Sequence, residues 1–167
     1  MDVNEKIVNE WLNLCKNRFT IQDIKFKVYG LKGGSNYSNI DILATDGKNY
    51  YDYEVKWTSA YGTPNTENGL KELREVVSQI YREGRKEKIK EYTNGESSQH
   101  FVVLSRNRFT KDDSYVKKLF NENDIIVLYF EDVVKELADK IGLKGRYDSE
   151  ISQIIRMLKL HGIINSK

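Results

Sequence analysis

Residues 40–57, IDILATDGKNYYDYEVKW, contain two segments that alternate in character and are separated by a short polar turn. The turn, DGKN at residues 46–49, has the composition of a tight hairpin connection. The flanking segments, 40–45 and 50–57, are rich in Ile, Leu, Tyr and Val, as strands are. The stretch therefore predicts two antiparallel strands joined by a hairpin.

This hairpin places three charged residues together. Side chains alternate along a strand, so Glu54 and Lys56 share one face, with Asp52 beside them. The opposite face is apolar and consists of Tyr51, Tyr53, Val55 and Trp57. Numbers of paired residues across a hairpin centred near residues 47–48 sum to about 95. Asp41 is therefore expected opposite Glu54, on the same face of the sheet.

Facing carboxylates indicate a cation site. Asp41 and Glu54 would repel each other unless a cation lay between them, and hard oxygen ligands suit Mg²⁺. Lys56 is placed to hold or activate a water, or to stabilise charge on a phosphate. The chain contains three Asp/Glu-x-Lys tripeptides. Only the one at residues 54–56 has both an acid in register on a facing strand and a glycine-rich loop, residues 33–39, before it.

The order of glycine-rich loop, strand aspartate, turn and strand Glu-x-Lys resembles the PD-(D/E)xK, or restriction-endonuclease-like, nucleases. Ile40-Asp41 stands where that superfamily has Pro-Asp, and Glu54-Val55-Lys56 fills its second motif. The resemblance implies that Asp41, Glu54 and the backbone carbonyl of Val55 bind Mg²⁺, with Mn²⁺ as a substitute. It also implies that Lys56 positions or deprotonates the water that hydrolyses a DNA phosphodiester.

Within this superfamily the archaeal Holliday-junction resolvases are the most similar in size and layout. They add a glutamate from the first helix, and Glu10 matches that position as a further ligand or as a rim acid. Ser35 or Ser38 corresponds to their loop serine. Gln79 corresponds to a glutamine that several branches carry after the lysine, although a polar residue at a core edge is equally ordinary. The resemblance implies a structure-selective homodimer that acts on junctions in DNA recombination.

Basic residues near the predicted site are expected to contact DNA phosphates. They are Arg106, Arg108 and Lys111, after an apolar strand, and Lys32 in the glycine-rich loop. A second basic cluster at residues 82–90 is interpreted as the solvated face of a helix.

The remaining chain predicts an α/β fold with a restriction-endonuclease-like core, in which helices flank a central mixed sheet of about five strands. Helices are expected at 3–18, 70–92, 114–121, 131–141 and 149–160, and strands at 21–29, 40–45, 50–57, 99–105 and 124–130. Val76, Ile80 and Gly84 are among the inner residues expected of the 70–92 helix. Residues 1–130 would form the nuclease core, and residues 131–167 a helical extension packed on it as part of one domain.

Composition sets outer limits on function. The 167 residues include 27 Lys and Arg against 25 Asp and Glu, a net charge of +2 that excludes a polycation binding through bulk charge. A single cysteine excludes an internal disulfide and suits a reducing compartment. The acidic N-terminus does not resemble a signal peptide, and no apolar stretch approaches the roughly 18 residues of a membrane span. A soluble cytoplasmic protein without a membrane partner is expected.

Two alternatives to a resolvase remain. A small sequence-specific restriction or homing endonuclease of the same fold would read bases with residues 58–69 and 106–111. A catalytically inactive nucleic-acid-binding module would keep the fold without the chemistry. The presence of all three motif residues favours an enzyme.

Overall fold

A computed structural model describes residues 2–28, 37–56, 76–106 and 114–164. The elements are α1 (Val3–Lys16), β1 (Phe19–Lys27), β2 (Tyr37–Thr45), β3 (Tyr50–Lys56), α3 (Gln79–Tyr92), β4 (Ser98–Leu104), α4 (Ser114–Asn121), β5 (Ile125–Tyr129), α5 (Phe130–Lys140) and α6 (Glu150–Leu160). Their order is the predicted one, and their ends agree with the predicted ends within three residues, except at the start of α3.

The five strands form one mixed sheet in the order β1-β2-β3-β4-β5. The first three strands pair antiparallel as a meander, whereas β3–β4 and β4–β5 pair parallel. In the hairpin, Ile42 pairs with Tyr53 and Thr45 with Tyr50, so partner numbers sum to 95. The general α/β class and the hairpin register are thus confirmed.

The turn between β2 and β3 fixes this register through Asp46. Its Oδ1 accepts hydrogen bonds from the backbone N–H groups of Lys48 and Asn49, at 2.9 and 2.8 Å. Its Oδ2 accepts a third from the Tyr51 hydroxyl at 2.7 Å. Gly47 has a φ of +88°, a conformation that residues with a Cβ rarely adopt. The predicted turn residues therefore each have a structural role.

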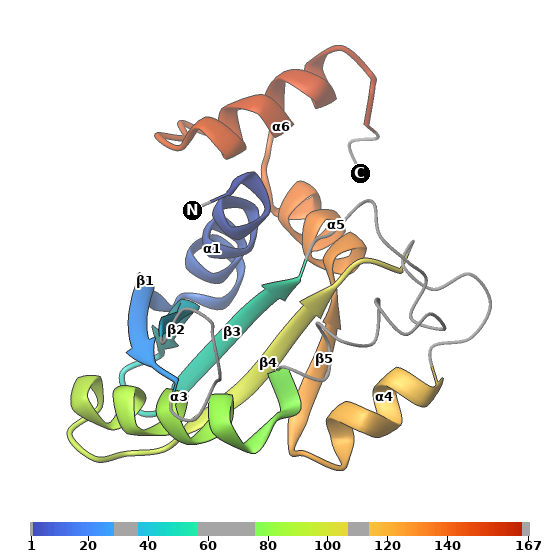
Figure 1. Ribbon diagram of the computed structural model, residues 1–167. Helices are drawn as coiled ribbons and strands as arrows, with labels where there is room; N and C mark the ends of the chain where they lie inside the picture. The colour runs from blue at the N-terminus through green and yellow to red at the C-terminus, as the bar shows by residue number, and fades with distance from the viewer. Residues whose placement is uncertain (1, 29–36, 57–75, 107–113, 165–167) are drawn as a thin grey trace.

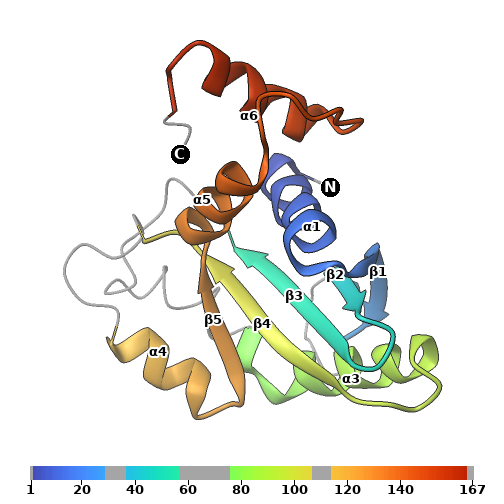
Figure 2. The same cartoon turned by 180° about the vertical axis from the view of Figure 1, so that it is seen from behind.

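Helices cover both faces of the sheet (Figures 1 and 2). Helices α1 and α5 lie on one face, and α3 and α4 lie on the other. The α1 face holds the largest core cluster, whose members from the sheet include Ile42, Ala44, Tyr53, Val55, Phe101 and Val103. The α3 and α4 face holds two smaller clusters, which include Val102, Leu104 and Phe120 in one and Ile40, Leu43 and Ile89 in the other. Tyr53 and Val55 thus take the apolar face predicted for them, whereas Trp57 lies outside the described residues.

Helix α3 begins at Gln79, not at residue 70 as predicted, although residues 76–77, just before the interruption at residue 78, are also helical. Ser78 has extended backbone angles, φ −65° and ψ 140°, which interrupt a helix, and its side chain makes no capping hydrogen bond. The helix therefore starts anew at this point, with Gly84, Arg85 and Ile89 buried, while Ile80 is 38% exposed. The predicted inner position of Ile80 is wrong for this reason, and residues 70–75 lie outside the described segments.

Glycine at position 84 lets α3 approach the sheet closely. A Cβ on Gly84 would lie 2.2 Å from the backbone oxygen of Lys27, at the end of β1. A contact that short cannot be relieved by a side-chain rotation, because the partner atom belongs to the backbone. Gly84 thus allows the neighbouring Arg85 to reach β3.

The C-terminal helices pack on α1. Leu137 of α5 and Ile155 of α6 belong to the same core cluster as Leu12. The Glu136 carboxylate accepts a hydrogen bond from Trp11 Nε1 at 2.8 Å. The segment expected as an extension is therefore continuous with the main core. In the described part of the chain, no helix combines the length and apolar character needed to cross a membrane.

Gly84→Ala should destabilise the protein, although alanine is the better helix former. The added methyl group forces α3 away from β1, and overpacking of this kind costs about 1–3 kcal/mol. Urea unfolding measures the loss, and Glu83→Ala at the exposed neighbouring position is the matched control. A Gly84→Ala protein as stable as this control would contradict the close approach.

Candidate active site

The candidate site begins where β2 and β3 separate. Among the described residues, the ladder between these two strands ends at Ile42 and Tyr53. Strand β2 nevertheless continues to pair with β1 as far as Tyr37, and β3 with β4 as far as Lys56. Asp41 is the first residue of β2 beyond the shared ladder, so its side chain lies where the two strands diverge.

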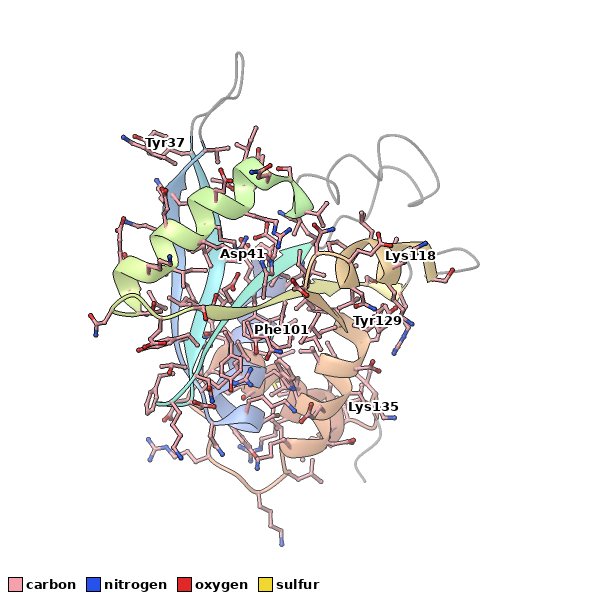
Figure 3. The ribbon with its side chains drawn as sticks, turned by 90° about the horizontal axis from the view of Figure 1, so that it is seen from below. Tyr37, Asp41, Phe101, Lys118, Tyr129 and Lys135 are labelled. Atoms are coloured by element: carbon pink, nitrogen blue, oxygen red, sulfur yellow. The ribbon has the colours of Figure 1, made fainter. Side chains whose placement is uncertain are left out.

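At this point the Asp41 carboxylate, in place of a backbone carbonyl of β2, accepts the hydrogen bond of a β3 backbone N–H. Its Oδ2 accepts from the Val55 N–H at 2.7 Å, and its Oδ1 accepts from Asn39 Nδ2 at 3.2 Å. Asp41 is only 5% exposed. Burial, and next the charge on Glu54, raise the pKa of Asp41 to about 7. The site therefore contains a buried carboxylate whose charge is poorly compensated, on the α3 side of the sheet (Figure 3).

Glu54 is buried as deeply but has two cationic partners. Lys56 Nζ lies 2.5 Å from its Oε1, and Arg85 Nη1 lies 2.5 Å from its Oε2. Burial acts to raise the pKa of Glu54, but the charges of Arg85 and Lys56 outweigh it and lower the pKa to about 2. Burial acts to lower the pKa of Lys56, but the neighbouring Glu54 carboxylate raises it by more, so the pKa lies above its ordinary value. Lys56 is therefore an ammonium group at neutral pH. Asp41, Glu54 and Lys56 are thus brought together as predicted.

Arg85 is the site residue that the sequence interpretation missed. Besides Glu54 it binds Asp52, with Nε 2.7 Å from Oδ1. Asp52 also accepts from Ser98 Oγ at 2.6 Å, and His100 Nδ1 lies 3.4 Å from its Oδ1. Arg85 is only 6% exposed, so the interpretation of residues 82–90 as a solvated face is wrong at this position. The available signal was Gly84, because a glycine on the inner face of a helix indicates close packing.

A backbone irregularity lies across from Asp41. Asp23 in β1 has a φ of +54°, which is uncommon for a residue with a side chain. Its neighbours pair regularly with β2, Gln22 with Ile42 and Ile24 with Ile40, whereas Asp23 and Asp41 do not pair. Strained backbone in folded proteins tends to gather near functional sites. The irregularity thus coincides with the divergence of β2 from β3.

Glu10 is placed elsewhere. Its Oε1 accepts a hydrogen bond from Ser149 Oγ at 2.6 Å and another from Ser152 Oγ, both at the start of α6. Helix α1 covers the face of the sheet opposite to the face that carries Glu54 and Lys56. The structure therefore does not bring Glu10 to the other candidate ligands but uses it to join α1 to α6. Its role as a metal ligand stays a prediction.

The auxiliary residues are dispersed. Gln79 is exposed at the start of α3, where its Nε2 donates to Glu83 Oε1 at 2.7 Å. Arg106 is exposed and forms two hydrogen bonds to Asp132 of α5, at 2.9 and 2.5 Å, while its guanidinium lies 4.3 Å from the Tyr129 ring centroid. Four further predicted residues lie outside the described segments: Lys32, Ser35, Arg108 and Lys111.

The donor set suits a small divalent cation. Among the described residues no group of three or more His, Cys, Asp and Glu side chains could hold a metal ion. Mg²⁺, however, usually takes one or two carboxylates and keeps several waters or phosphate oxygens. Asp41 and Glu54 provide such a pair, and the poorly compensated charge of Asp41 is the observation that fits an added cation. The carbonyl of Val55 is the third candidate ligand.

Comparison with protein-family models, with curated proteins and with solved structures finds no match to this chain. The site is therefore interpreted from its own geometry. It combines two buried carboxylates of different proton affinity with an ammonium group beside them, on one face of a rigid sheet. Such a site can hold a cation and orient a nucleophile next to a phosphate group.

Arg85→Met should strongly destabilise the protein, because it leaves Asp52 buried without its cationic partner and leaves Glu54 with Lys56 alone. Removal of one partner from a buried ion pair typically costs about 3–5 kcal/mol. Urea unfolding measures the loss, with Arg82→Met on the same helix as the control. Asp52→Asn in the Arg85→Met background should recover part of the lost stability. If the effects of the two substitutions on the free energy of unfolding simply added, that result would argue against the contact between Arg85 and Asp52.

Asp41→Asn should stabilise the cation-free protein at pH 8 by about 1–3 kcal/mol. Because the folded-state pKa of Asp41 is about 7 and its ordinary value is 3.8, ionisation costs stability above pH 7. This cost falls as the pH decreases between these values, so the gain from Asp41→Asn should be smaller at pH 5. Thermal unfolding in EDTA at the two pH values measures the difference. An equal gain at both would refute the raised pKa.

Proposed function

We propose that this protein is a Mg²⁺-dependent DNA endonuclease that hydrolyses phosphodiester bonds. The observation that carries the proposal is the position of Asp41 at the divergence of β2 and β3, where it accepts a hydrogen bond from the Val55 N–H and senses the charge of Glu54. Lys56 Nζ lies 2.5 Å from Glu54 Oε1 in the same place. The sequence resemblance to the PD-(D/E)xK nucleases supports it, and the five-stranded mixed sheet is compatible with a core of that kind.

Each residue has a role that follows from its environment. Asp41, Glu54 and the carbonyl of Val55 would hold Mg²⁺, and Mn²⁺ would substitute for it. When bound, the cation supplies positive charge that acidifies a water and neutralises phosphate oxygens. Lys56 stays protonated, so it orients the attacking water and stabilises negative charge on the phosphate rather than removing a proton. Arg85, on α3, holds the Glu54 carboxylate in position through its contact with Oε2.

The proposed substrate is branched DNA, as in the Holliday-junction resolvases, with a homodimer that cuts two strands. A sequence-specific restriction or homing endonuclease is the alternative within the same chemistry. An inactive nucleic-acid-binding module is the alternative from another class. The hydrogen bonds of Glu10, on α1, to the start of α6 remove the structural support for one resolvase feature. The resemblance alone supports the preference for junctions.

A substrate panel tests the activity. Four-way junction, plain duplex, plasmid and single-stranded DNA are incubated with the protein in Mg²⁺, in Mn²⁺ and in EDTA. We expect cleavage of the junction that requires the cation. Cuts at a fixed sequence in plasmid DNA would select the restriction-like alternative. Absence of cleavage of every substrate in both cations would refute the proposal and leave the inactive module.

Asp41→Asn and Lys56→Met should each lower the cleavage rate on the order of 100-fold or more, because each removes a group that acts on the reacting phosphate or water. Binding of junction DNA, measured by fluorescence anisotropy in EDTA, should change little. Glu10→Gln is the matched carboxylate-to-amide control and should keep the wild-type rate. A Glu10→Gln rate as low as that of Asp41→Asn would instead make Glu10 a ligand.

A further inference from the structure

A pocket of about 540 Å³ lies between α3, the start of β4 and the turn that precedes β5. Its volume is within the range of about 300–1,000 Å³ that is usual for small-molecule sites. Asp52 and Arg85 contribute to its lining, so the pocket shares two side chains with the candidate active site. None of the predicted site residues lines it.

One wall of the pocket is cationic. Arg82, Lys86 and Lys90 line it from α3 at four-residue intervals, about 6 Å apart along the helix axis. Like charges at this spacing destabilise a helix slightly. Within the described segments, Lys86 and Lys90 have no ion pair, and Arg82 Nη1 binds the neutral Asn123 Oδ1 at 2.8 Å. An anion in the pocket would relieve this repulsion.

The facing wall is polar and rich in acceptors. It consists of residues 96–100 and 123–125, including the carboxylates of Glu96 and Asp124. His100 Nε2 is buried and has no hydrogen-bond partner in the described structure. The other ring nitrogen, Nδ1, faces the Asp52 carboxylate, which can only accept, so the proton of a neutral ring belongs on Nδ1. Nε2 is thus an unused acceptor.

We infer that this pocket binds one nucleotide, with its phosphate on the Arg82, Lys86 and Lys90 wall and its base toward His100. A nucleotide has an anionic end and a base with N–H donors, which matches the two walls. The inference relies on the proposed function only for its choice of a nucleotide over another phosphorylated ligand. The unit is either a free nucleotide or one residue of a DNA strand beside the cleavage site.

The test uses the full chain in EDTA, where no cleavage occurs. Isothermal titration calorimetry follows deoxynucleoside monophosphates and inorganic phosphate, and fluorescence anisotropy follows a labelled single-stranded oligonucleotide. Lys86→Gln/Lys90→Gln removes two charges from the exposed wall and keeps good helix formers. Lys135→Gln/Lys140→Gln on α5, beyond the opposite face of the sheet (Figure 3), removes two exposed charges as a control.

We expect Lys86→Gln/Lys90→Gln to weaken binding about tenfold or more, and the control to match the wild type. If only the binding of the oligonucleotide depends on Lys86 and Lys90, the ligand is a DNA strand. If only the binding of the monophosphates depends on them, the ligand is a free nucleotide. The inference would be overturned if the Lys86→Gln/Lys90→Gln protein bound as tightly as the control variant, or if inorganic phosphate bound as tightly as the nucleotides. Binding that does not saturate below about 1 mM would also overturn it. Failure of the endonuclease proposal would appear only in the cleavage assay.

Discussion

A guanidinium group buried between two carboxylates holds the candidate site together. Strand β3 carries Asp52 and Glu54 on a face that the rest of the sheet and its helices make largely apolar, where burial of an unpaired charge is costly. Arg85 neutralises both, at 2.7 and 2.5 Å. The arrangement requires α3 to lie very close to the sheet, which Gly84 allows. The position of α3 and the charge balance of the site therefore depend on each other.

This constraint divides the charges of the site unequally. Arg85 and Lys56 both interact with Glu54, whereas Asp41 relies mainly on hydrogen bonds from Val55 and Asn39. The two carboxylates consequently differ in proton affinity, one held ionised and the other close to its titration midpoint at neutral pH. Asp41 is therefore the carboxylate with the weaker compensation of its charge, whereas Glu54 interacts with two cationic side chains.

Local patterns allowed the hairpin to be predicted from the sequence. The DGKN turn and the alternation at residues 51–56 determine register and faces together, so numbering places Asp41 near Glu54, although the observed ladder ends one pair earlier, at Ile42 and Tyr53. Arg85 could not be found in this way, because its partner Asp52 is 33 residues distant and basic residues on helices are usually solvated. The start of α3 was missed because the apolar spacing continues through Ser78 although the backbone does not. Glu10 was ambiguous, since an acid at the edge of an apolar stripe suits either a ligand or a link between helices.

The parallel pairing of β3 with β4 also has a consequence for how the chain folds. The β2–β3 hairpin closes over four residues, whereas 41 residues, from 57 to 97, separate β3 from β4 along the chain. Closing a long loop costs entropy before its contacts compensate for it, so the meander should form early and the parallel half late. Asp52 and Glu54 then stay hydrated through the early steps, and they lose their water only as α3 arrives with its own counter-charge. In this expected order of folding, Asp52 and Glu54 are buried together with Arg85.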